Sequence, residues 1–113
     1  MKYEDLVETA MQMILFAGDA RDDIKHALDA MMNDDEAEAQ KYMESAKEAL
    51  AQAHHCQTDI IQKEAAGERC EYSMLFTHAQ DTLMTVNTEI NLANHLVEMT
   101  AALDERIKKL ENK

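Results

Sequence analysis

Apolar residues recur every three or four positions along most of the chain, which is the spacing of one face of an α-helix. This rhythm runs from about Tyr3 to Met32, from about Glu36 to Glu64, and from about Glu71 to the end of the chain. The pattern predicts three helices joined by short connections, so that neighbouring helices are antiparallel. We therefore expect an all-α protein, a single domain over residues 1–113 built as an antiparallel three-helix bundle.

Two breaks separate the predicted helices. In Asn33-Asp34-Asp35, either aspartate can cap the following helix. In Ala65-Ala66-Gly67-Glu68, the glycine suits a left-handed turn at a helix end. Gly18 lies inside the first predicted helix, where a glycine costs roughly 1 kcal/mol relative to alanine and is tolerable if something packs closely against it.

The third segment has the most unusual pattern. From Ser73 to Leu103 it carries three formal charges, Asp81, Glu89 and Glu98. Such a helix has no ordinary solvated face, so we expect most of its circumference to be buried. One stripe is apolar and contains Phe76, Ala79, Leu83, Val86, Ile90, Ala93 and Val97; a second is polar and small, with His78, Asp81, Thr82, Thr85, Thr88 and Asn91. Because buried polar groups need partners, the polar stripe is expected to face another copy of the chain or a site.

Composition supports the helical interpretation and excludes several functions. The 113 residues include no proline and two glycines. A formal net charge of -12 argues against nucleic acids and anionic membranes as partners. There is no long apolar run and no signal peptide, and the two cysteines form no Cys-x-x-Cys motif, so we expect a reduced, cytoplasmic protein.

His78 is the leading candidate for chemistry. Asp81 follows three residues later and shares its helix face, whereas Gln80 points elsewhere within one chain. A neutral imidazole nitrogen can accept a phosphoryl group while the other ring nitrogen is held by a hydrogen bond. On spacing alone, a structural histidine remains the alternative. The other histidines have no ligand-spaced partners, and no phosphate-binding glycine loop or serine elbow is present.

Three sequence segments together indicate a function more specifically than the spacing of His78 and Asp81 does. The run LFTHAQDTLMT, preceded by FAGDAR and AHHCQTDIIQKEAAGE, resembles the IIA component of the lactose/cellobiose (N,N'-diacetylchitobiose) class of the bacterial phosphoenolpyruvate-dependent sugar phosphotransferase system. The resemblance covers nearly the whole chain, with the segments in the family's order. It implies an enzyme, a phosphotransferase component that carries a phosphoryl group during uptake of a β-linked disaccharide.

The resemblance also implies residue roles. His78 corresponds to the phosphoryl acceptor, forming tele-phosphohistidine, with Gln80 and Thr82 as candidate donors to phosphoryl oxygens. The phosphoryl group would come from HPr and pass to a cysteine of the IIB component, with the membrane involved only through IIC. The family's proteins are homotrimers, which places Asp81 at one divalent ion on the trimer axis, expected to be Mg²⁺.

One position departs from the family. Thr82 stands where a second histidine is common, so any auxiliary role of that histidine is absent or met by the threonine hydroxyl.

The alternative to a phosphoryl carrier is a non-catalytic helical interaction or regulatory protein that keeps the bundle without the relay.

Overall fold

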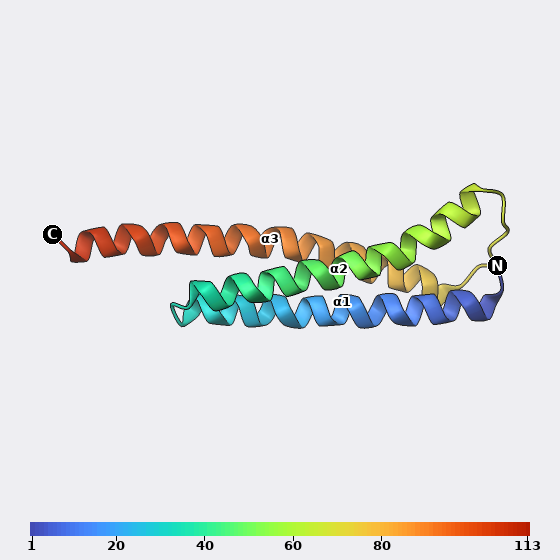
Figure 1. The fold of residues 1–113 in the computed structure, drawn as a ribbon, viewed down its shortest axis with the longest axis horizontal. Coiled ribbons are helices and arrows are strands. Elements are labelled where there is room, and N and C mark those ends of the chain that lie inside the picture. Colours follow the sequence, from blue (N-terminus) through green and yellow to red (C-terminus); the bar gives the residue numbers. More distant parts are fainter.

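The computed structural model describes all residues, 1–113, as three long α-helices with no strand. They are α1 (Tyr3–Met32), α2 (Glu36–Ala65) and α3 (Met74–Glu111). Each runs antiparallel to the one before it, and together they form a rod of 67 × 20 × 18 Å (Figure 1). The prediction of an all-α antiparallel three-helix bundle is confirmed for the single chain.

The helix ends follow local side-chain chemistry. The Asp35 carboxylate accepts a hydrogen bond from the backbone N–H of Glu38 at 3.1 Å, as expected for a cap of α2. Gly67 has a positive φ of 96°, which glycine adopts without strain, in the turn after α2. The predicted start of α3 near Glu71 is wrong by three residues. Ser73 caps this helix, its hydroxyl accepting from the N–H of Phe76 at 3.2 Å.

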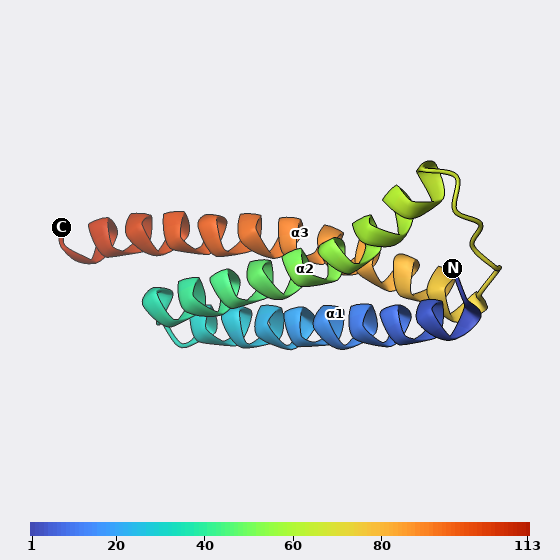
Figure 2. The same cartoon turned by 45° about the vertical axis from the view of Figure 1, so that its right-hand side comes forward.

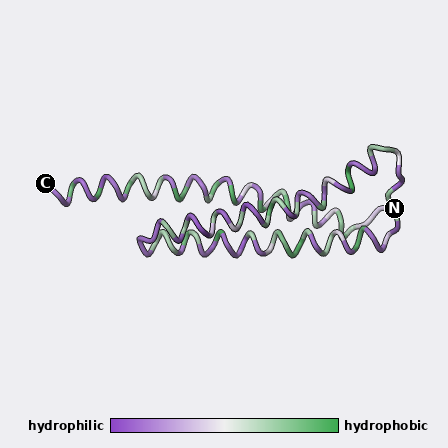
Figure 3. Tube along the Cα trace, viewed as in Figure 1, coloured by the Kyte–Doolittle hydropathy of each residue, from purple (hydrophilic) through white to green (hydrophobic).

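The core is thin and rich in alanine. Half of the twenty buried apolar residues are alanines: Ala10, Ala17, Ala20, Ala27, Ala30, Ala39, Ala46, Ala53, Ala79 and Ala93. These alanines recur at helical spacing. Figure 3 shows the corresponding pattern, in which hydrophobic and hydrophilic residues alternate along each helix. Small side chains let the helix axes approach closely, and the larger Leu6, Met13, Met43 and Leu83 fill the remaining space.

An ion pair joins α1 to α3 outside this core. The Arg21 guanidinium donates from Nε and Nη2 to the two carboxylate oxygens of Glu89, each at 3.0 Å. This hydrogen-bonded pairing raises the pKa of Arg21. The sequence pattern did not predict this contact, because the two residues are 68 positions apart.

The surroundings of Gly18 are open. A Cβ at this position would meet no neighbouring atom within 4 Å, so no close packing explains the glycine. The condition of close packing, under which this glycine would be tolerated, is therefore not met within one chain.

The two ends of the rod differ. At one end, the last turns of α2 lean away from α1, and residues 61–69 are all exposed (Figures 1 and 2). At the other end, α3 extends past the loop that joins α1 to α2, and no residue after Val97 is buried. The expectation that most of the α3 circumference is buried is therefore wrong for one chain, since α1 and α2 cover only one of its sides.

Close helix packing predicts a specific response to added volume. Ala46→Leu should lower the free energy of unfolding by about 1–3 kcal/mol, because Ala46 has no exposed surface and a larger side chain must push the helices apart. Ala51→Leu, at an exposed position of the same helix, should change it by less than about 0.5 kcal/mol. Urea denaturation at equal protein concentration measures both; equal effects would contradict close packing at Ala46.

Candidate functional site

His78 lies in the second turn of α3 and its side chain is exposed. The Ser73 cap fixes where the helix begins and hence the direction in which His78 points. Met74, four residues earlier, and Asp81, three residues later, are also exposed on the same face of the helix. The predicted proximity of His78 and Asp81 on one helix face agrees with the structure.

Thr82 also belongs to the His78 environment, through the backbone. Its hydroxyl donates a hydrogen bond to the carbonyl oxygen of His78 at 2.9 Å. Thr85 bonds in the same way to the carbonyl of Asp81 at 2.8 Å, and Thr88 to that of Met84 at 3.2 Å. Threonines bonded back to the preceding turn need no external hydrogen-bond acceptor. The threonine hydroxyls of the polar stripe therefore have hydrogen-bond partners within their own helix, which the sequence pattern did not indicate.

Gln80 lies apart from His78. It contributes to a cavity of about 320 Å³ beneath the connection between α2 and α3, together with Leu6, Ile60 and Phe76. Within one chain the structure brings His78, Asp81 and Thr82 onto adjacent positions but places Gln80 on another side of α3. This is the arrangement that helix geometry predicted for Gln80.

The exposed face of α3 forms a continuous surface, which we call the α3 strip. It consists of Met74, His78, Asp81, Thr85, Thr88, Leu92, His95, Leu96, Met99, Leu103, Ile107 and Leu110. Its first part is polar around His78, and its second part, from Leu92, is mostly apolar. The six large apolar side chains of the second part are 39–67% exposed. A surface of this kind is typical of an interface. The polar stripe alone had not indicated this apolar continuation.

Metal binding by one chain has no structural basis. No group of three or more His, Cys, Asp or Glu side chains is arranged to hold an ion. Asp81 supplies a single exposed carboxylate on the α3 strip. Its oxygen atoms suit a hard cation, so the donor set fits an ion only where other copies of the chain add their own carboxylates.

The remaining histidines lie outside any such cluster. The His26 ring stacks on Tyr42 with centroids 5.1 Å apart, and its Nδ1 is 2.8 Å from the carbonyl oxygen of Asp22. His95 Nδ1 is 4.0 Å from a carboxylate oxygen of Glu98. His54 is half-buried and His55 exposed on α2. None of the four has an arrangement that competes with His78.

None of the three helices combines the length and the apolar character that a membrane span requires.

Comparison with known proteins gives consistent matches. A family described as "PTS system, Lactose/Cellobiose specific IIA subunit" matches residues 8–101. The "Lichenan-specific phosphotransferase enzyme IIA component" of Bacillus subtilis (strain 168) is 37% identical over 103 residues, covering 91% of this chain and 94% of the relative. The "PTS system lactose-specific EIIA component" of Lacticaseibacillus casei is 34% identical over 110 residues, covering 97% and 95%.

Solved structures match over a similar extent. The cellobiose-specific enzyme IIA from Bacillus anthracis has a TM-score of 0.85 and 39% identity, covering 93% of this chain and 94% of that one. PtcA from S. mutans has a TM-score of 0.87 and 34% identity, covering 89% and 99%. Both sequence and fold are therefore shared over almost the full length.

Proposed function

The chain belongs to the lactose/cellobiose-specific IIA family of the sugar phosphotransferase system, and from this we propose that it carries a phosphoryl group on His78. As a IIA component it is part of a phosphoryl relay and works with other proteins of that system. The observation that supports His78 as the carrier is its exposed position on a capped helix, with no side-chain partner that would block its ring.

The proposed reaction is two successive displacements at phosphorus. Nε2 of neutral His78 attacks the phosphoryl group of phospho-HPr; the new N–P bond forms as the N–P bond to the donor histidine breaks, and the donor ring keeps the electron pair. A cysteine thiolate of IIB then attacks the same phosphorus, forming an S–P bond as the bond to His78 breaks. Positioning and charge stabilisation are the main demands of such transfers. The sugar receives its phosphoryl group beyond this step.

Partner access fits the surroundings of His78. Met74 is 74% exposed and Met84 51% exposed, while Leu75 is half-buried. Exposed methionines form adaptable contacts that suit binding to two different proteins in turn. The net charge of -12 favours donors and acceptors with basic surfaces and should make association faster at low ionic strength.

Gln80 and Thr82 remain candidate donors to phosphoryl oxygens, with different requirements. Thr82 must release the carbonyl of His78 before its hydroxyl can donate to a phosphoryl oxygen. Gln80 lies toward the cavity beneath the α2–α3 connection, so it can serve a phosphorylated histidine only where another chain brings its His78 alongside.

We further propose that three chains assemble in parallel through the α3 strip. The apolar part of the strip then becomes buried, and the back-bonded threonines enter the interface without losing hydrogen bonds. Three Asp81 carboxylates would meet on the axis, each pair at about 5 Å repelling by about 3 kcal/mol at an effective dielectric of ~20. One divalent cation, expected to be Mg²⁺, would compensate this repulsion.

Phosphorylation should depend on His78 alone. With phosphoenolpyruvate, enzyme I and HPr, the wild type should acquire one acid-labile phosphate per chain, and His78→Ala should acquire none. His95→Ala, which removes another exposed histidine of the α3 strip, should be phosphorylated normally. Phosphate on the His78→Ala protein would refute the assignment, and an unlabelled wild type would favour a non-catalytic interaction protein.

Assembly should depend on the apolar part of the α3 strip. Light scattering should give about three times the 12.8 kDa mass of one chain at micromolar concentration. Leu103→Glu should reduce the mass toward that of one chain, because three buried carboxylates would repel each other. Met32→Glu, at an exposed apolar position on α1, should leave the trimer intact. Equal behaviour of the two variants would exclude the strip as the interface.

Asp81 should couple assembly to a cation. A chelator should lower the melting temperature of the wild type, because it removes the charge that compensates three carboxylates. Asp81→Leu should be insensitive to chelator and as stable as the wild type or more so, since apolar replacement of a buried charge cluster is often neutral or better. Asp104→Leu removes a carboxylate elsewhere on α3 and should keep the chelator effect. A chelator effect of the same size, or none, in wild type and Asp81→Leu would contradict this role.

A further inference from the structure

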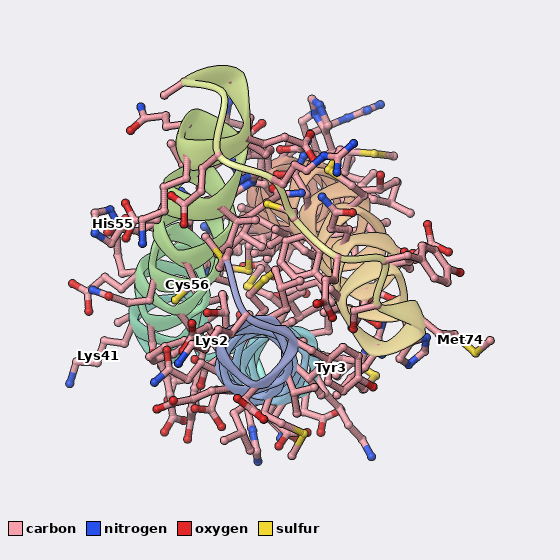
Figure 4. All side chains as sticks on the ribbon, turned by 90° about the vertical axis from the view of Figure 1, so that its right-hand side faces the viewer. Lys2, Tyr3, Lys41, His55, Cys56 and Met74 are labelled. Carbon is pink, nitrogen blue, oxygen red and sulfur yellow. The ribbon has the colours of Figure 1, made fainter.

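A groove runs between α1 and α2 on the side of the bundle away from the α3 strip. Two neighbouring cavities of about 500 and about 510 Å³ make up this groove, and they share Phe16, Asp19 and Gln52. In the end-on view, Cys56 marks the groove side and Met74 the strip side, across the bundle from one another (Figure 4). The flank of α1 that carries Arg21 and Leu28 faces α3. The groove therefore stays accessible when the strip is covered.

The floor of the groove is apolar. Phe16 and Ala49 are half-buried and pack against the core. At one end, Cys56 Sγ lies 3.8 Å from the side-chain oxygen of Gln12, and burial raises the pKa of the Cys56 thiol. At the rim, Leu15 is 64% exposed. This surface can accept an aliphatic side chain from outside.

The rim of the groove is negatively charged. Asp19, Asp22, Asp23 and Glu48 line it, and no lysine or arginine does. Arg21, the nearest arginine in sequence, is committed to Glu89 on the opposite flank of α1. His26, at the far end, is stacked on Tyr42. Four carboxylates around an apolar floor repel anionic ligands and complement a partner that combines positive charge with apolar side chains.

We infer that this groove docks a basic amphipathic helix of a protein partner. A trough between two antiparallel helices accepts a third helix along its length, with apolar residues at helical spacing as anchors. An anchor would lie against Phe16, and flanking lysine or arginine side chains would reach Asp19 and Asp23. Docking here neither uses nor covers His78, so the inference is independent of the proposed relay and of the α3 strip.

A model peptide tests the charge requirement. The probe is a helical peptide of leucine and lysine about 15 residues long, which spans the distance from Gln12 to His26 at ~1.5 Å per residue. Asp19→Asn/Asp23→Asn should weaken its binding about fivefold, since each exposed ion pair contributes roughly 0.5 kcal/mol. Glu105→Gln/Glu111→Gln makes the same change in net charge at exposed sites of α3 and should leave the affinity unchanged. Fluorescence anisotropy of labelled peptide measures both, after circular dichroism has confirmed equal helicity.

Position and apolar contact are tested in the same titration. Peptide addition should shift the amide resonances of Phe16, Asp19 and Gln52 but not those around His78, and Leu15→Gln should weaken binding without a change in charge. A peptide of equal composition with scrambled apolar spacing should bind more weakly. Equal weakening by the two charge variants, equal binding of the scrambled peptide, or shifts confined to the α3 strip would each overturn the inference. Phosphorylation of His78 in the same variants gives an independent readout of the relay.

Discussion

The structure depends on one constraint: α3 has an apolar face that no part of its own chain covers. α1 and α2 have 30 residues each and α3 has 38, so the hairpin covers one side of α3 and falls short of its C-terminal end. A helix segment of about a dozen residues is marginal in water without packing. Six large apolar side chains of α3 between Leu92 and Leu110 remain partly exposed. Because about half of each side chain is still exposed, covering the six contributes roughly 5–9 kcal/mol per chain, which is of the same order as the estimated 4–15 kcal/mol cost of association.

In the proposed assembly, the two parts of the α3 strip have different roles. The apolar part from Leu92 onward supplies surface that favours association. The part from Met74 to Thr88 carries His78 and the one carboxylate of the strip, Asp81. Its threonines bond to the preceding turn, so helices can approach there without leaving hydroxyls unsatisfied. In this account, the association of chains holds three His78 side chains at one end of the assembly.

Much of the fold could be predicted from spacing, and less of the site. The three-four rhythm identified the three helices and the buried stripe Leu83, Val86, Ile90 and Val97 correctly, because burial of an amphipathic helix follows its period. The start of α3 was misplaced because the cap at Ser73 depends on one side-chain hydrogen bond. The Arg21–Glu89 pair and the groove beside Cys56 were missed because they depend on how helices lie against each other. His78 was distinguished from the other histidines by the LFTHAQDTLMT resemblance, since spacing alone allowed a structural histidine.

The central claim, that chains pair in parallel through the α3 strip with their His78 side chains at one end, can be tested by spin-label distances. In a Cys56→Ser/Cys70→Ser background, a nitroxide is attached at Glu111→Cys, at the C-terminal end of α3. Adjacent parallel helices are about 8–10 Å apart, so double electron–electron resonance should give a short interchain distance, within roughly 25 Å once the label arms are included. An antiparallel arrangement would place the labels about a helix length apart, roughly 57 Å at 1.5 Å per residue. That long distance, or the absence of any interchain distance, would contradict the account.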